Sequence, residues 1–589
     1  MQLQLPFLRD SAAAGKQFFV DGEPFLIRGA QLQNSSLTSA DFMNEIWPKL
    51  AQAHINTVLG CVTWEMIEPE EGKFNFEELD GVIEGARKHG LRLILLWFGS
   101  FKNGKPACML HCGALSLDKF LIQISRPGLS TYAPAWVKKD TKRFPRAMLR
   151  KAGGLLAVAD VLSIFHEEAQ IADAKAFKAM IQHLKEVDTN QFTVIMVQVE
   201  NEVGILGDSR DGSPAATDRF TSPVPQKLID FLTDNWDSMH DTLKTNLAAL
   251  RTYSPSSSSN GSWEAVFGQS QRTDEIFMAY HYALYLEQVA AAGKEIYPLP
   301  MYTNVWQDYA GGDTENDFPV VVGGGGEPGD YPSGGGVANV LDIWRSFAPT
   351  LDFIAPDIYL NNYASVCAKY RHGNQPLFVP EQRRDEYGAR RIWLAYGNYQ
   401  ALGTSAFGID TLTFDENPFK KHYDLLAKVS SFVLAAQQKP GSIIGLCFDE
   451  LLPTGEDTSP AFTATFGAWN LRIERSFVFG RPGPGFGMVI HLDNARFLLI
   501  GEGFQVKFTS TRSTAVFTGI LKFVEKEVVN ETTGEMRSWR TLGGDETRSG
   551  AAAVMPGEKP DYGGFPISVT IPARTRIAEC EVYALENYT

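Results

Sequence analysis

A chain of 589 residues is too long for one ordinary hydrophobic core, because single cores stop growing at about 250–300 residues. Hydrophobic residues make up 44% of it and charged residues 21%, a balance that excludes disorder over most of its length. The net charge of −15 gives a surface that repels phosphate, so we expect no nucleic-acid partner.

The amino-terminal residues do not indicate export or membrane anchoring. The segment MQLQLPFLRDSAAAGKQFFVDG has no basic stretch followed by an apolar one, as a signal peptide would. No apolar run reaches the roughly 18 residues needed to cross a bilayer. The six cysteines are too few for a disulfide framework in so long a chain. We therefore expect a cytoplasmic protein with no membrane partner, and export by another route stays open.

Short apolar runs alternate with longer helical patterns from about residue 17 to 436, which is typical of βα units around a parallel sheet. Eight such runs occur, at 25–33, 56–64, 92–100, 192–204, 298–306, 351–360, 376–382 and 403–410. They predict an α/β protein with a (β/α)8 TIM barrel and long loops. An open doubly wound sheet is the alternative, but no GxGxxG turn follows the first run.

The pattern changes after the helical segment HYDLLAKVSSFVLAAQQ. Short alternating strands such as FQVKFTST, GILKFVEKEVV and PISVTIPA follow, with turn residues between them. We therefore expect a catalytic barrel over residues 1–440 and a smaller all-β accessory domain over residues 441–589.

Residues 105–136 interrupt the third unit of the predicted barrel. Most of this segment lacks a sustained period of 2 or 3.6, and without it WFGSFKNG would run almost directly into STYAPAW. We predict that residues 106–129 are an insertion that the protein does not need. The alternative is an ordinary long barrel loop that forms a substrate lid.

Two glutamates end predicted strands, where a TIM barrel builds its active site. Glu202 follows the fourth run, after Glu200 and Asn201, and Glu381 follows the seventh. Strands four and seven converge across the barrel mouth. Glycoside hydrolysis needs one carboxylic acid to protonate the departing oxygen and one carboxylate to attack or to activate water. The pair therefore indicates this chemistry, with a salt bridge or loop cap as the structural alternative for each.

These motifs resemble those of the large TIM-barrel glycosidase clan. VQVENEVG at 197–204 resembles glycoside hydrolase family 35, the β-galactosidases, and TWEMIEPEEGKFNFEELD at 63–80 is similar to family 35 and also to bacterial family 42. The resemblance implies that Glu202 is the general acid/base, that Glu381 is the nucleophile, and that Asn201 binds the sugar 2-hydroxyl. Val203 replaces the usual Tyr, and WFGSFKNG replaces the usual Ala-Glu segment that contacts the sugar.

Asn201 poses a geometric problem. Adjacent residues of a regular strand point to opposite faces, so Glu200 and Glu202 would share a face and Asn201 would point away. The strand must therefore end or bulge near Asn201.

Further substrate-binding candidates are aromatic residues at or just past strand ends, for which packing is the alternative role. They are Trp64, Trp97, Tyr302, Trp306 and Tyr359. We expect Tyr359 to donate a hydrogen bond to the nucleophile.

The expected function is that of a retaining hydrolase of terminal β-glycosidic bonds, with β-galactosidase favoured by the resemblance and another β-linked sugar open. A β-linked oligosaccharide or glycoside is the expected partner. A barrel that binds carbohydrate without catalysis is the alternative. A metal-dependent lyase or aldolase is disfavoured, because the strand ends show no His/Asp/Glu cluster with ligand spacing. We expect no metal and no cofactor.

Overall fold

The structure is a computed structural model that describes residues 4–11, 15–102, 132–253, 261–309, 325–476, 480–568, 570 and 573–587. The predicted insertion at 106–129 lies outside these ranges. Among the described helices, none is both long and apolar enough to cross a membrane.

A parallel sheet of eight strands forms the centre of the larger part, and each predicted run contributes one strand to it. The strands are β4 (Ile27–Gln31), β5 (Thr57–Thr63), β6 (Arg92–Lys102), β9 (Val194–Asn201), β10 (Met301–Trp306), β11 (Phe353–Asp357), β12 (Phe378–Val379) and β13 (Gly403–Phe407). Every residue of β5 is buried, as expected for a strand covered on both faces. The prediction of eight βα units is confirmed.

The sheet closes on itself. Its strand order is β11-β10-β9-β6-β5-β4-β13-β12, so consecutive barrel strands are neighbours. A parallel bridge between Ile358 and Gln382 joins the two ends, and the Ile358 N–H donates to the Glu381 carbonyl oxygen at 2.8 Å. The TIM barrel is therefore confirmed, and all eight strands point their carboxyl ends at one mouth.

Helices follow the strands and cover the outside of the barrel. They are α1 (Ala40–Asn44), α2 (Trp47–Gln52), α4 (Glu77–Lys88), α7 (Glu167–Asp188), α12 (Gln271–Lys294), α14 (Leu341–Phe347), α15 (Tyr363–Tyr370), α16 (Glu386–Asn398) and α17 (Phe419–Gln437). In α4 the buried residues Leu79, Val82, Ile83 and Ala86 recur at helical spacing, which forms the apolar stripe that packs on the sheet.

Smaller elements lie at the two ends of the barrel. At the amino end, the sheet of β1 (Phe7–Ser11), β2 (Gly15–Val20) and β3 (Glu23–Pro24) adds Phe18 and Val20 to the apolar cluster of the barrel interior. The long loops contain β7 (Arg146–Arg150), β8 (Leu156–Leu162), α3 (Trp64–Ile67), α6 (Ala135–Lys139), α8 (Pro214–Thr221), α9 (Gln226–Asp234), α10 (Asp241–Asn246) and α11 (Trp263–Phe267).

The carboxyl-terminal part is all-β, as predicted. A six-stranded antiparallel sheet contains β14 (Ile443–Phe448), β17 (Gly485–Asp493), β18 (Arg496–Glu502), β20 (Ala515–Asn530), β21 (Glu535–Thr541) and β23 (Ile577–Glu586). A four-stranded sheet contains β15 (Phe462–Phe466), β16 (Trp469–Arg475), β19 (Phe504–Ser510) and β22 (Ala553–Met555). Both sheets contribute to one apolar cluster, so they form a sandwich.

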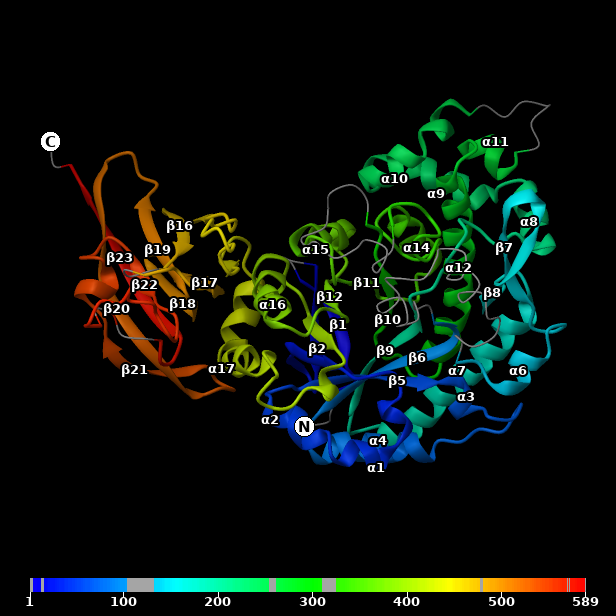
Figure 1. Ribbon diagram of the computed structural model, residues 1–589, viewed down its shortest axis with the longest axis horizontal. Helices are drawn as coiled ribbons and strands as arrows, with labels where there is room; N and C mark the ends of the chain where they lie inside the picture. The colour runs from blue at the N-terminus through cyan, green and yellow to red at the C-terminus, as the bar shows by residue number, and fades with distance from the viewer. Residues whose placement is uncertain are drawn as a thin grey trace.

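The six-stranded sheet is apolar on both faces. In β17, Val489 belongs to the sandwich core, whereas its neighbours Met488 and Ile490 belong to the core of the barrel. Successive strand residues point to opposite faces, so one face packs on the second sheet and the other on the barrel helices. Figure 1 shows α16 and α17 between the barrel strands and this sandwich. The boundary predicted at 440/441 thus falls between α17 and β14, across a shared apolar core.

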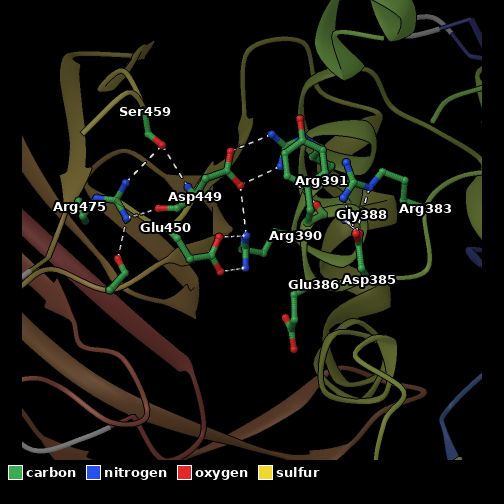
Figure 2. Close-up of polar contacts among 12 residues, drawn as sticks. Arg383, Asp385, Glu386, Gly388, Arg390, Arg391, Asp449, Glu450, Ser459 and Arg475 are labelled. Atoms are coloured by element: carbon green, nitrogen blue, oxygen red, sulfur yellow. Dashed lines mark hydrogen bonds and ion pairs between the residues drawn. The ribbon is translucent and has the colours of Figure 1, made fainter. Parts of the chain in front are cut away.

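Charged side chains at the start of α16 add a polar contact to this junction (Figure 2). Arg391 donates to both carboxylate oxygens of Asp449, at 2.9 and 2.8 Å. Arg390 donates to Glu450 at 3.0 and 2.7 Å and to Asp449 at 3.2 Å. Although burial opposes it, the arginines lower the pKa of Asp449. Both guanidinium groups are almost fully buried, so their charges depend on the carboxylates that follow β14.

Asp449→Ala should destabilise the whole chain. It leaves the buried Arg391 guanidinium without its carboxylate, a loss that costs about 3–5 kcal/mol for a fully buried pair and about 2 kcal/mol here, where Asp449 is 29% exposed. The matched control is Glu450→Ala, since Glu450 is 62% exposed and should cost about 0–1 kcal/mol. Urea unfolding measures both variants, and equal losses would contradict this account of the junction.

Candidate active site

Three carboxyl groups from different strands meet at the barrel mouth. Glu202 follows β9, Asp357 ends β11, and Glu381 lies two residues after β12. One oxygen of each lies within 4.8 Å of the others, and all three residues are at most 8% exposed. The structure therefore brings Glu202 and Glu381 together, and it adds Asp357, which the sequence did not single out.

Glu381 is held by two neutral hydrogen-bond donors. The Nε2 of Gln31, the last residue of β4, donates to its Oε1 at 2.7 Å, and the hydroxyl of Tyr359 donates to its Oε2 at 2.8 Å. Tyr359 thus lies where the sequence predicts it. Burial raises the pKa of Glu381 above its ordinary value, and the charge of Glu202 adds to this effect, while Lys102 and the two donors oppose it.

Glu202 pairs with a cation. The Nζ of Lys102, the last residue of β6, lies 3.1 Å from Glu202 Oε2, and Asn201 Nδ2 donates to the same oxygen at 3.3 Å. Burial alone would lower the pKa of Lys102, but the negative charges of Glu202, Glu381 and Asp357 outweigh it and raise that pKa. Lys102 therefore remains an ammonium ion in the middle of the acidic cluster.

Asp357 is buried beside both glutamates and bonded to Asn304. Its Oδ2 accepts a hydrogen bond from Asn304 Nδ2 at 2.8 Å. Burial raises its pKa well above the ordinary value, the charges of Glu381 and Glu202 raise it further, and a hydrogen bond to Glu202 favours the protonated form. Burial and the neighbouring charges therefore favour the neutral form of the Asp357 carboxyl group.

The backbone of β9 bends at the predicted place. Glu200 and Glu202 have φ angles of 60° and 46°, in the left-handed region that non-glycine residues rarely adopt. This bend breaks the strand alternation and turns Asn201 toward Glu202. Asn304 stabilises the bend, because its Oδ1 accepts the Glu202 N–H at 2.9 Å and its Nδ2 donates to Asn201 Oδ1 at 3.2 Å.

Three of the aromatic candidates do not reach the site. The rings of Trp64, Trp97 and Tyr302 are completely buried, so they have no free face for a sugar. Trp64 donates to Glu68 at 2.9 Å and Trp97 donates to Asp173 at 2.9 Å.

Tyr302 lies in the barrel interior among other aromatic rings. Trp306, at the end of β10, is only partly buried and stays a candidate.

The sequence reasoning missed four residues that build the site: Gln31, Lys102, Asn304 and Asp357. Each lies at or near the carboxyl end of a barrel strand, where a TIM barrel builds its active site. Asp357 and Asn304 lie inside the apolar runs 351–360 and 298–306, and such a run predicts strand interior.

Three converging carboxyl oxygens are also a donor set that could hold a cation. The predicted absence of ligand clusters at the strand ends overlooked this arrangement. The Lys102 ammonium lies 3.1 Å from Glu202 and already supplies a positive charge there.

Two family models match parts of the chain. The model described as Beta-galactosidase, of glycoside hydrolase family 42, matches residues 36–112, and one described as a domain of unknown function (DUF5597) matches residues 419–553. The first match covers β5 and β6 and ends before Glu202, whereas the second begins at α17 and runs through most of the sandwich. The finer assignment to family 35 stays a prediction.

Two curated proteins resemble short stretches of the chain. Beta-galactosidase Pbg of Clostridium perfringens is 39% identical over 74 residues, which are 12% of this chain and 10% of that protein. Exo-beta-D-glucosaminidase of Thermococcus kodakarensis is 35% identical over 102 residues, 15% of this chain and 13% of that protein.

Solved structures of similar arrangement include beta-galactosidases from Marinomonas ef1 and Halorubrum lacusprofundi. The first is 12% identical, covers 70% of this chain and 62% of its own, and has a TM-score of 0.43. The second is 13% identical, covers 68% and 58%, and has a TM-score of 0.43. The matched stretches cover only 10% and 13% of the length of the two curated relatives.

Proposed function

We propose that the protein is a retaining glycoside hydrolase in which Glu202 is the general acid/base and Glu381 is the nucleophile. The observation that carries the proposal is the pair of buried carboxyl groups at the barrel mouth, with oxygens within 4.8 Å of each other. Retaining enzymes place their two carboxyl groups about 5–5.5 Å apart, whereas inverting enzymes need about 6.5–9.5 Å to admit a water molecule. The short separation therefore favours double displacement.

In the first step, Glu381 attacks the anomeric carbon of the sugar. A bond forms between that carbon and a Glu381 carboxylate oxygen, and the bond to the departing oxygen breaks as Glu202 gives it a proton. Gln31 and Tyr359 aim the attacking carboxylate through their hydrogen bonds. Both donors are neutral, so they orient Glu381 without cancelling its charge.

In the second step, the Glu202 carboxylate takes a proton from water. The water oxygen attacks the anomeric carbon, and the bond to Glu381 breaks, which restores the free carboxylate. Two displacements at the same carbon return its original configuration.

A terminal β-galactoside is the substrate that we favour. The support is the similarity of residues 36–112 to the Beta-galactosidase family and of a shorter stretch to a named beta-galactosidase. A β-linked glucosaminide is a second candidate, because the third carboxyl group, Asp357, offers a further hydrogen-bond partner for an amino group on the sugar. The similarity to an exo-beta-D-glucosaminidase supports this second candidate.

Replacement of the two glutamates should separate their roles. Glu202→Ala should lower kcat/KM on alkyl glycosides by about 10²–10⁴-fold, because a poor leaving group needs a proton. Its turnover of nitrophenyl glycosides should be partly rescued by azide, with formation of a β-glycosyl azide. Glu381→Ala should yield no product of retained configuration.

The wild-type protein is the reference in this experiment, tested on nitrophenyl β-galactoside and β-glucosaminide with the product anomer followed by NMR. An inverted first product would contradict double displacement. Binding of sugars without turnover of any glycoside would instead support the non-catalytic barrel.

Tyr359→Phe should move the acidic limb of the pH profile to higher pH. Glu381 must be ionised to attack, so activity falls as the pH drops through its pKa, which burial already raises. The hydrogen bond from Tyr359 favours the ionised form of Glu381. Loss of this bond in the variant therefore raises the pKa of Glu381 further. The measurement is kcat/KM against pH.

Tyr363→Phe is the matched control, since the Tyr363 hydroxyl donates to Gln382 Oε1 at 2.8 Å rather than to Glu381. Its acidic limb should coincide with that of the wild type. If the acidic limb of Tyr359→Phe also coincides with that of the wild type, Tyr359 is excluded as a partner of the nucleophile.

A further inference from the structure

The third barrel strand carries a bulge beside Glu202. Along the β6–β9 pair, Trp97 lies opposite Val199, and the next paired residues are Lys102 and Asn201. The four residues 98–101 of β6 therefore lie opposite a single residue of β9, Glu200. A bulge of this size leaves backbone N–H groups without their ladder partners.

The side chain of Glu200 accepts hydrogen bonds from these N–H groups. Its Oε1 accepts from the N–H of Ser100 at 3.0 Å, and its Oε2 accepts from the N–H groups of Phe101 and Gly99 at 2.9 and 3.3 Å. Glu200 is completely buried, so its carboxyl group replaces the backbone partner that the bulge removes.

Asp173 on α7 completes this support. It is completely buried and accepts from the Ser100 hydroxyl at 2.5 Å, the Ser100 N–H at 3.1 Å and the Trp97 indole at 2.9 Å. Burial raises the pKa of Glu200 well above its ordinary value, and the charge of Asp173 and a hydrogen bond between the two carboxyl groups raise it further. The two buried carboxyl groups thus accept the N–H and O–H groups of the bulge from both sides.

The bulge leaves no room for a side chain at position 99, so both carboxyl groups pack directly on its backbone. A Cβ at Gly99 would lie 2.5 Å from Glu200 Oε1 and 2.6 Å from Asp173 Oδ1. The path of residues 98–101 therefore places Lys102 where its ammonium is 3.1 Å from Glu202.

Titratable groups from several elements interact with Lys102 or Glu202. They are Cys61 on β5, Asp357 on β11, Tyr359 after β11, Glu381 after β12, and Tyr132 and Tyr309 from the loops. Lys102 is the single cation among these described groups, so it counters the negative charge of the cluster.

We propose that Lys102 belongs to the catalytic machinery as the cation that governs when Glu202 carries its proton, and that Glu200 and Asp173 are the residues that position it. This inference rests on the proposed function. A fixed ammonium favours the Glu202 carboxylate, the form that takes a proton from water in the second step.

Lys102→Met should move the basic limb of kcat/KM to higher pH by about 1–3 units, the effect expected when an opposite charge this close is removed. The substrate is an alkyl or disaccharide glycoside, whose departure depends on the Glu202 proton. Lys102→Arg keeps the charge and should hold the limb near its original place.

Lys138→Met is the matched control for a general loss of positive charge, because Lys138 pairs with Glu65 at 2.9 Å. Its basic limb should stay in place. An unmoved limb in Lys102→Met, or an equal movement in Lys138→Met, overturns the role of Lys102.

Glu200→Gln tests the positioning residues. A Gln amide group would turn a donor toward the N–H groups of the bulge, so the bulge and Lys102 should shift. The basic limb should move in the same direction as in Lys102→Met, and the double variant should move no further than Lys102→Met alone. If Glu200→Gln does not fold, Ser100→Ala removes the bond to Asp173 and should produce a smaller movement. If the shifts of the basic limb in the two single variants add up in the double variant, Glu200 does not act by positioning Lys102.

A second measurement separates this inference from the proposed function. Melting temperatures of Lys102→Met, Glu202→Gln and the double variant should show coupling, because each single change removes the same ion pair. A wild-type protein that hydrolyses no glycoside would refute the proposed function while leaving this coupling to be measured. Additive melting temperatures would refute the Lys102–Glu202 pair itself.

Discussion

The burial of three carboxyl groups in one small volume is the constraint on which the rest of the site depends. Glu202, Asp357 and Glu381 have oxygens within 4.8 Å of one another, and charges so close repel strongly where water is scarce. Two features make the arrangement stable: the raised pKa of Asp357, which favours its neutral form, and the ammonium ion of Lys102. Neutral donors hold Glu381 without cancelling its charge.

This arrangement requires an irregular backbone. Glu200 and Glu202 adopt left-handed conformations, each of which costs about 1–3 kcal/mol and persists only when the surroundings enforce it. Asn304 enforces the bend of β9 by bonding to the Glu202 N–H, and Glu200 enforces the neighbouring bulge of β6. The two irregular segments lie side by side, so the same Glu200 residue bends one strand and supports the other.

Much of the fold could be predicted from the sequence, because a strand covered on both faces leaves a continuous apolar run. Glu202, Glu381 and Tyr359 could be predicted for a related reason, since a polar residue that ends such a run lies at the barrel mouth. Trp97 satisfied the same rule, yet it is buried because the bulge begins directly after it. Lys102 and Asp357 were missed because their positions depend on that bulge and on the register of β11, which no local pattern encodes.

The carboxyl-terminal sandwich is connected to the site through α16. β12, which precedes Glu381, has only two residues, so few ladder hydrogen bonds hold Glu381 in place. Additional support comes from Gln382, whose side chain donates to the Gly388 carbonyl at the start of α16. The same helix packs against β14 so closely that a Cβ at Gly445 would lie 1.9 Å from the Trp393 carbonyl oxygen. The sandwich therefore packs on α16, and α16 in turn accepts a hydrogen bond from the residue that follows Glu381.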